Sequence, residues 1–150
     1  MTQGEIALEN QLIKQLTGIG YSTVDVQNEE SLLSNLKAQL EKRKNTSLSK
    51  LEFKKILNIL NKGTIFERAK TLRGQQRIER DNGEDLYFYF LDKDNWNSNT
   101  FQVTNQVTIE GVYKNRYDVT VLVNGLPLVQ IELKRRGVEM AEAFHQIVRY

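Results

Sequence analysis

The feature that most constrains the fold is a pair of alternating segments joined by an Asn-Gly turn at residues 124–125. Every second position of both segments is apolar: Val119, Val121, Val123, Val129, Ile131 and Leu133. An alternation with a period of two is typical of β-strands, because successive side chains point to opposite faces. The pattern therefore predicts two strands, Tyr117–Val123 and Leu128–Lys134, that form a hairpin.

Three ionisable residues have the opposite parity to these apolar positions. They are Asp118 in the first strand and Glu132 and Lys134 in the second, so they should share one face of the hairpin. Two carboxylates on directly paired residues, about 5 Å apart, repel each other unless a cation joins them. An oxygen-ligated divalent ion such as Mg²⁺ suits such a pair. Taken alone, the pattern leaves open a metal site or an ordinary solvated strand face that carries Glu-x-Lys.

The pairing of Asp118 with Glu132 depends on the shape of the turn. A strict two-residue turn at Asn124 and Gly125 would place Asp118 opposite Ile131, which points to the other face. Asp118 can lie opposite Glu132 only if the loop has three residues, Asn124 to Leu126, or if one strand contains a bulge. We therefore predict a three-residue loop or a bulge, with Gly125 free to adopt a positive φ.

The first half of the chain has helical patterns. Apolar spacing and caps predict helices over 5–17, 31–44, 51–61 and 65–72, with an extended piece over 21–26 and Gly63 just after the third helix. From about Gln75 onward the alternation of strands takes over. Strands are predicted over 76–80, 86–91 and 101–110, and a last helix over 138–150. This order favours an α/β or α+β fold, with a mixed sheet flanked by helices.

Length and composition narrow the class of protein. A chain of 150 residues is enough for one domain, residues 1–150, with one core. Cysteine is absent, which excludes disulfides and thiol catalysis and makes a reducing cytoplasm the natural setting. No apolar run approaches the roughly 18–20 residues that a membrane span needs. The net charge of +2 is too small to indicate nucleic-acid binding by itself.

Around the hairpin the sequence resembles a known family. An Asp, a hairpin and then Glu-x-Lys is similar to the PD-(D/E)xK nuclease motif, with Tyr117 in place of the usual Pro before the Asp. The stretch VTNQVTIEGVYKNRYDVTVLVNGLPLVQIELKRRG, followed by AFHQIVRY, resembles the N-terminal nuclease region of type I restriction enzyme R (HsdR) subunits. LNKGTIFERAKTLRG resembles another segment of that family, and the first helix matches more loosely.

The resemblance implies a role for each site residue. Asp118 and Glu132 would bind Mg²⁺ together with the backbone carbonyl of Leu133, and Lys134 would be the catalytic lysine. The family also places an acid on the first helix near the metal, for which Glu9 is the first choice and Glu5 the second. A further set would support the site or contact DNA phosphates: Gln146, Tyr150, Arg135 and Arg136.

The resemblance also implies an activity and partners. The chain would be the endonuclease domain of a longer R subunit that cuts double-stranded DNA with modification and specificity subunits. An ATP-dependent translocase would lie in the rest of that subunit, because no GxxxxGK[ST] loop occurs in these 150 residues. The isolated fragment should then cut weakly or not at all. The alternatives are a non-catalytic DNA-binding or assembly module on the same fold, or a nuclease of another PD-(D/E)xK branch.

Overall fold

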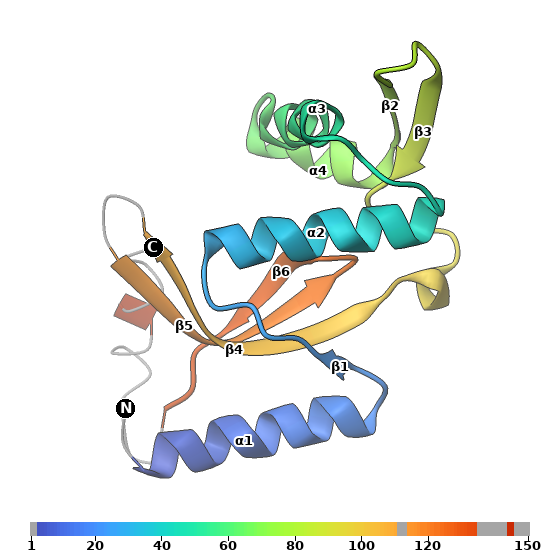
Figure 1. Ribbon diagram of the computed structural model, residues 1–150. Helices are drawn as coiled ribbons and strands as arrows, with labels where there is room; N and C mark the ends of the chain where they lie inside the picture. The colour runs from blue at the N-terminus through green and yellow to red at the C-terminus, as the bar shows by residue number, and fades with distance from the viewer. Residues whose placement is uncertain (1–2, 111–113, 135–143, 146–150) are drawn as a thin grey trace.

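The computed structural model describes residues 3–110, 114–134 and 144–145 and shows an α+β fold. A four-stranded sheet has helix α1 on one side and helix α2 on the other (Figure 1). Beyond α2 lies a further layer made of helices α3 and α4 and a two-stranded hairpin. The predicted order of helices first and strands second is confirmed.

The four helices lie close to their predicted ranges. They are α1 (Gln3–Gly18), α2 (Glu29–Lys44), α3 (Lys50–Asn61) and α4 (Ile65–Arg73). Capping boxes fix the starts of three of them, with N-cap residues Asn28, Ser49 and Thr64. Gly63 has a φ of 86° just after α3, as predicted for the residue that ends that helix. Among the described residues, no helix is long and apolar enough to cross a membrane.

The large sheet has the strand order β1-β4-β5-β6. Its strands are β1 (Ser22–Thr23), β4 (Phe101–Glu110), β5 (Lys114–Val123) and β6 (Leu126–Ile131). β1 pairs with β4 in parallel, and the other pairs are antiparallel, so the sheet is mixed. The small sheet is the hairpin of β2 (Gln75–Glu79) and β3 (Asp85–Tyr89), and a short 3₁₀ helix, η1 (Trp96–Ser98), precedes β4.

The structure corrects the predicted hairpin at residues 124–125 in two respects. The turn has two residues, because Val123 pairs with Leu126, and both Asn124 and Gly125 have positive φ angles of 53° and 84°. The predicted three-residue loop is therefore wrong, and the alternative, a bulge, is confirmed between Val121 and Leu122. β6 also begins and ends earlier than predicted, so Glu132 and Lys134 follow the strand instead of lying within it.

The bulge restores the register that the two-residue turn would lose. Leu122 pairs with Pro127, but Val121 pairs with Val129, so Leu128 is the extra residue. β5 itself is covered on both faces, because Thr120 and Leu122 are as fully buried as Val119. The alternative of an ordinary solvated face therefore does not hold for β5, which lies between β4 and β6 and buries Asp118 as well.

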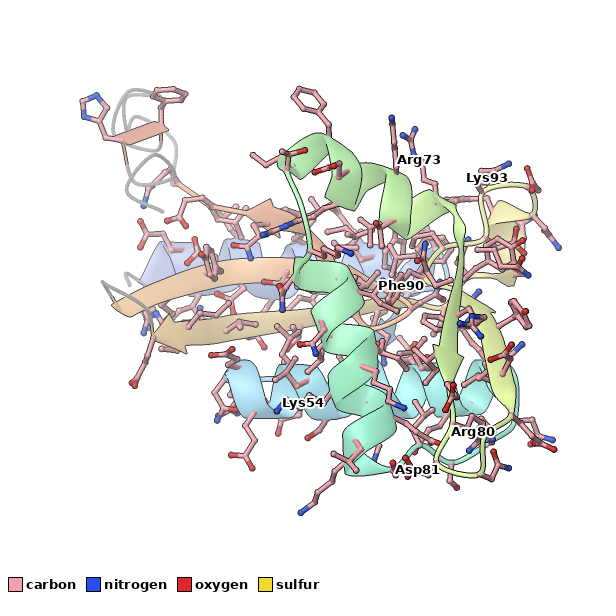
Figure 2. All side chains as sticks on the ribbon, turned by 90° about the horizontal axis from the view of Figure 1, so that it is seen from above. Lys54, Arg73, Arg80, Asp81, Phe90 and Lys93 are labelled. Carbon is pink, nitrogen blue, oxygen red and sulfur yellow. The ribbon has the colours of Figure 1, made fainter. Side chains whose placement is uncertain are left out.

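The main core joins the two layers. Its buried side chains come from α2, the α2–α3 connection, α3, the β2–β3 hairpin and the residues just after it, and the ends of β5 and β6 at their turn: Leu36, Leu40, Leu48, Ile56, Ile78, Phe88, Phe90, Leu91, Val123 and Leu126. Figure 2 shows Phe90 in the interior of the molecule, where it is 1% exposed. Of the predicted helix over 138–150, only Phe144 and His145 lie within the described residues, and both are helical.

Candidate functional site

Asp118 lies in β5 between its two neighbouring strands. On one side, Asn105 pairs with Val119 and Val107 with Tyr117, so the register sets Gln106 of β4 across from Asp118. On the other side, Val119 pairs with Ile131 at the end of β6. Glu132 is the next residue after Ile131, and the structure therefore brings Asp118 and Glu132 together.

The carboxylate of Asp118 also fixes the segment that follows β6. The backbone N–H of Leu133 donates a hydrogen bond to Oδ2 of Asp118 over 2.8 Å. The Asp118 side chain thus satisfies a backbone N–H that lies just beyond the last residue pair of β5 and β6. Since Asp118 is itself buried at 8% exposure, this bond holds residues 132–134 beside it in a largely enclosed position.

Glu132 and Lys134 form an ion pair within this segment. Lys134 Nζ lies 3.0 Å from Glu132 Oε1, and the Glu132 side chain is only 5% exposed. Burial raises the pKa of Glu132 above its ordinary value and the nearby Asp118 raises it further, against the opposing effect of the Lys134 hydrogen bond. Burial lowers the pKa of Lys134, but Glu132, Asp118 and Glu5 outweigh it, so that its pKa is raised.

The donor set around Asp118 fits a hard divalent cation. Oε2 of Glu132 is buried and has no hydrogen-bond partner, and the Asp118 carboxylate is close enough to disfavour the charge on Glu132. A cation would satisfy the free oxygen and remove this repulsion. Within the described parts of the chain no group of three His, Cys, Asp or Glu side chains is placed to hold a metal ion by itself, so Asp118 and Glu132 would be joined by other ligands, such as a backbone carbonyl or water.

Helix α1 brings two acids to the same region, one turn apart. Glu9 is 4% exposed, and its two oxygens accept hydrogen bonds from the side-chain amides of Asn105 and Gln106 in β4. Glu5 is close enough to Lys134 to raise the pKa of that lysine. The chain after β6 runs toward the first turns of α1 (Figure 1). Both helix acids named from the sequence therefore lie on the side of α1 that meets the site.

Four of the residues expected to support the site lie outside the described residues. They are Arg135, Arg136, Gln146 and Tyr150. The structure places Asp118, Glu132, Leu133 and Lys134 together and leaves the contribution of those four as an expectation.

Asn105 and Gln106 are the residues of this region that the sequence analysis missed. The apolar positions of β4 are the odd ones, Phe101, Val103, Val107 and Ile109, and Asn105 interrupts that series. A polar residue at a core-facing position needs a buried partner. This signal was present in the sequence, but it could not identify the partner as Glu9, which lies 96 positions earlier.

Comparison with known proteins identifies the family of the chain. Residues 2–150 match the family model described as the type I restriction enzyme R protein N terminus. The chain is 46% identical over 153 residues to the type I restriction enzyme SsaAORF53P endonuclease subunit of Staphylococcus saprophyticus, and 45% identical over 153 residues to the SauCOLORF180P endonuclease subunit of Staphylococcus aureus. It is 38% identical over 154 residues to the EcoprrI endonuclease subunit of Escherichia coli.

These alignments cover 99% of this chain in each case but much less of the relatives. The chain spans 16% of the length of each staphylococcal protein and 49% of the Escherichia coli one. The region of similarity therefore includes the entire site described above, from Glu5 on α1 to Lys134 after β6.

Proposed function

The chain belongs to the family of type I restriction enzyme R protein N termini, and from this we propose that it is the Mg²⁺-dependent nuclease domain, residues 1–150, of such a subunit. Its reaction would be the hydrolysis of phosphodiester bonds in double-stranded DNA. One observation carries the proposal: two buried carboxylates, Asp118 and Glu132, meet beside Lys134, and an oxygen of Glu132 has no partner.

The proposed roles follow from the chemistry of each group. Asp118 and Glu132 would hold the Mg²⁺ with the carbonyl of Leu133. The bound ion would supply Lewis-acid activation of the scissile phosphate and of a water molecule. Asp118 orients the segment through the Leu133 N–H, over 2.8 Å. Lys134, whose pKa is raised, stays protonated at neutral pH and would stabilise negative charge that develops on the phosphate.

The proposal extends to the rest of the subunit. Because the chain spans 16% of its staphylococcal relatives, the larger part of such a protein lies outside these residues. We propose that this remainder contains the ATP-dependent translocase and that modification and specificity subunits join it on DNA. The nuclease domain would then cut without reading bases, and phosphate contacts from Arg135, Arg136, Gln146 and Tyr150 would position it.

Cleavage by alanine variants of the full-length R subunit in its complex tests this proposal. Asp118→Ala, Glu132→Ala and Lys134→Ala should each reduce DNA cleavage by roughly a hundredfold or more, because each removes a group that stabilises charge in the transition state. ATP hydrolysis by the complex should continue, since these residues would have no part in it. DNA cleavage by all three variants at the wild-type rate would contradict the proposal.

Calorimetry separates this function from a non-catalytic role. Titration of the wild-type subunit with Mn²⁺ should release or absorb heat, and the Asp118→Ala variant should show much less. If neither protein binds the ion and cleavage is unaffected, the fold is instead a DNA-binding or assembly module.

A further inference from the structure

We propose that Asn105 and Gln106 are positioning residues that hold the carboxylate of Glu9 on α1 toward the site of Asp118 and Glu132, an inference that rests on the proposed nuclease function. Their side-chain amides would act as a two-pronged clamp on the Glu9 carboxylate. The clamp would thereby strengthen the binding of the divalent cation without touching it.

The clamp requires an irregular backbone in β4. Adjacent side chains in a strand point to opposite faces, so Asn105 and Gln106 should not reach the same group. Both nevertheless donate to Glu9, Asn105 to Oε1 and Gln106 to Oε2, the latter over 2.6 Å. Gln106 has a φ of 58°, a left-handed conformation that is rare for a residue with a side chain and that breaks the alternation. Strain of this kind is typical of functional sites.

The chemistry of the clamp differs from that of a structural buried acid elsewhere in the protein. Glu52 is also buried, at 3% exposure, and its charge is neutralised by Arg80. Glu9 is equally buried, yet its two partners in the described part of the chain are neutral amides. Amides satisfy the oxygens of a carboxylate without supplying a positive charge. A carboxylate held in this way is suited to attract a cation.

The position of the clamp connects it to the site. Gln106 lies at the register position across from Asp118, between the pairs Asn105–Val119 and Val107–Tyr117. One turn before Glu9, Glu5 interacts with Lys134, so this side of α1 reaches the segment that follows β6. The unpartnered Oε2 of Glu132, on a side chain that is 5% exposed, is an independent sign that the region is incomplete without a cation.

Mn²⁺ calorimetry on the full-length R subunit, without DNA or ATP, tests the clamp. Gln106→Gly removes the amide and suits the positive φ, and Asn105→Val removes the other amide and continues the apolar series of β4. Each variant should bind Mn²⁺ roughly tenfold more weakly, the effect typical of losing a residue that supports a metal ligand. In a Glu9→Gln background, Gln106→Gly should cause no further loss of affinity.

Gln102→Val is the matched control. Gln102 is a buried amide in the same strand, but it bonds to Asn35 of α2 instead of to Glu9, so its variant should keep the wild-type affinity for Mn²⁺. If the clamp variants also bind Mn²⁺ like the wild type while Asp118→Ala does not, the amides merely fasten α1 to the sheet and the inference fails. If Asp118→Ala binds as well as the wild type, the proposed nuclease site itself fails.

Discussion

Glu52 shows how one buried acid can join separate parts of the chain. Its side chain is 4% exposed and accepts hydrogen bonds from the backbone of Ser49 and Asp81 and from the guanidinium of Arg80. Arg80 also donates to Thr46 and Ser47. Figure 2 shows Arg80 and Asp81 at the turn of the β2–β3 hairpin, near the start of α3. This network fastens the hairpin to the α2–α3 connection.

We expect Glu52→Gln to reduce the free energy of unfolding by about 1–3 kcal/mol, because hydrogen bonds to a charged group are lost within a buried network. Urea unfolding followed by circular dichroism measures the change. Asp85→Asn is the control: Asp85 pairs with Arg77 at the surface, with exposed fractions of 36% and 54%. An exposed pair contributes about 0–1 kcal/mol, so equal effects of the two variants would contradict the role of burial.

The lowered pKa of Glu52 predicts how the stability of the protein depends on pH. The hydrogen bond from Arg80 is the main cause that lowers the pKa of Glu52 from 4.5 to about 2. A carboxylate with a lowered pKa contributes stability above its unfolded pKa, and this contribution is lost as the pH falls through the folded value. Between pH 4.5 and pH 2 the wild type should therefore lose stability more steeply than Glu52→Gln. Thermal melts across this range would show parallel curves if the idea is wrong.

At the scale of elements, the β5–β6 turn determines where α2 can pack. Asn124 is 1% exposed, donates to the carbonyl of Phe90 and to Oδ1 of Asn99, and accepts from the N–H of Thr100. Gly125 lies so close to α2 that an added Cβ would be 2.7 Å from Cα of Leu36. The turn is thus held on one side by the connection before β4 and on the other by a helix backbone.

Two glycines with nearly the same φ allow the stability cost of backbone strain to be separated from the cost of this close contact. Gly125 has a φ of 84° and Gly83 one of 82°, but a Cβ on Gly83 would have nothing within 4 Å. Gly83→Ala should cost about 1 kcal/mol for its left-handed backbone alone. Gly125→Ala should cost about 1–3 kcal/mol more, because the clash is with backbone that cannot rotate away. Chemical denaturation of both variants measures the difference, and equal losses would rule out the steric contribution.

The sequence predicted elements well where the signals are local. The starts of α2, α3 and α4 depend on capping residues, and the structure places them within two residues of the predicted positions 31, 51 and 65. β4 lies over its predicted range because its apolar positions alternate. The second strand of the hairpin was predicted to start at Leu128, but β6 starts at Leu126 and includes Pro127, which is unusual in a strand. β6 is at the edge of the sheet, where a residue without an N–H is tolerated.

Candidate site residues were predictable only in part. The pairing of Asp118 with Glu132 follows from the equal parity of their positions once a three-residue loop or a bulge is allowed. Parity could not decide between the loop and the bulge. The amide partners of Glu9 could not be predicted, because they depend on contacts between residues 96 and 97 positions apart and on the positive φ of Gln106. Local patterns carry no information about such distant contacts.

Across the whole molecule, some elements of the site are neighbours in the sequence and others are far apart. β4, β5 and β6 follow one another directly, so Asp118 and Glu132 meet through two short connections. The first part of the chain joins them through contacts of long sequence separation, such as the pairing of Ser22 with Gln102, the hydrogen bond of Asn35 to Gln102 and the bonds of Glu9. Residues between these segments form α2, α3, α4 and the small hairpin.

These sequence separations predict the order in which parts of the protein form during folding. Closing a long loop costs more entropy than closing a short one, and distant contacts form slowly. During refolding, amide protons of β5 and β6 should become protected before the N–H of Val24, which bonds to Val103 across the β1–β4 pair. Pulse-labelled hydrogen exchange would show this delay, and simultaneous protection would contradict it. A partly folded chain would hold Asp118 and Glu132 side by side before Glu5 and Glu9 of α1 pack against them, so the complete site would be among the last features to form.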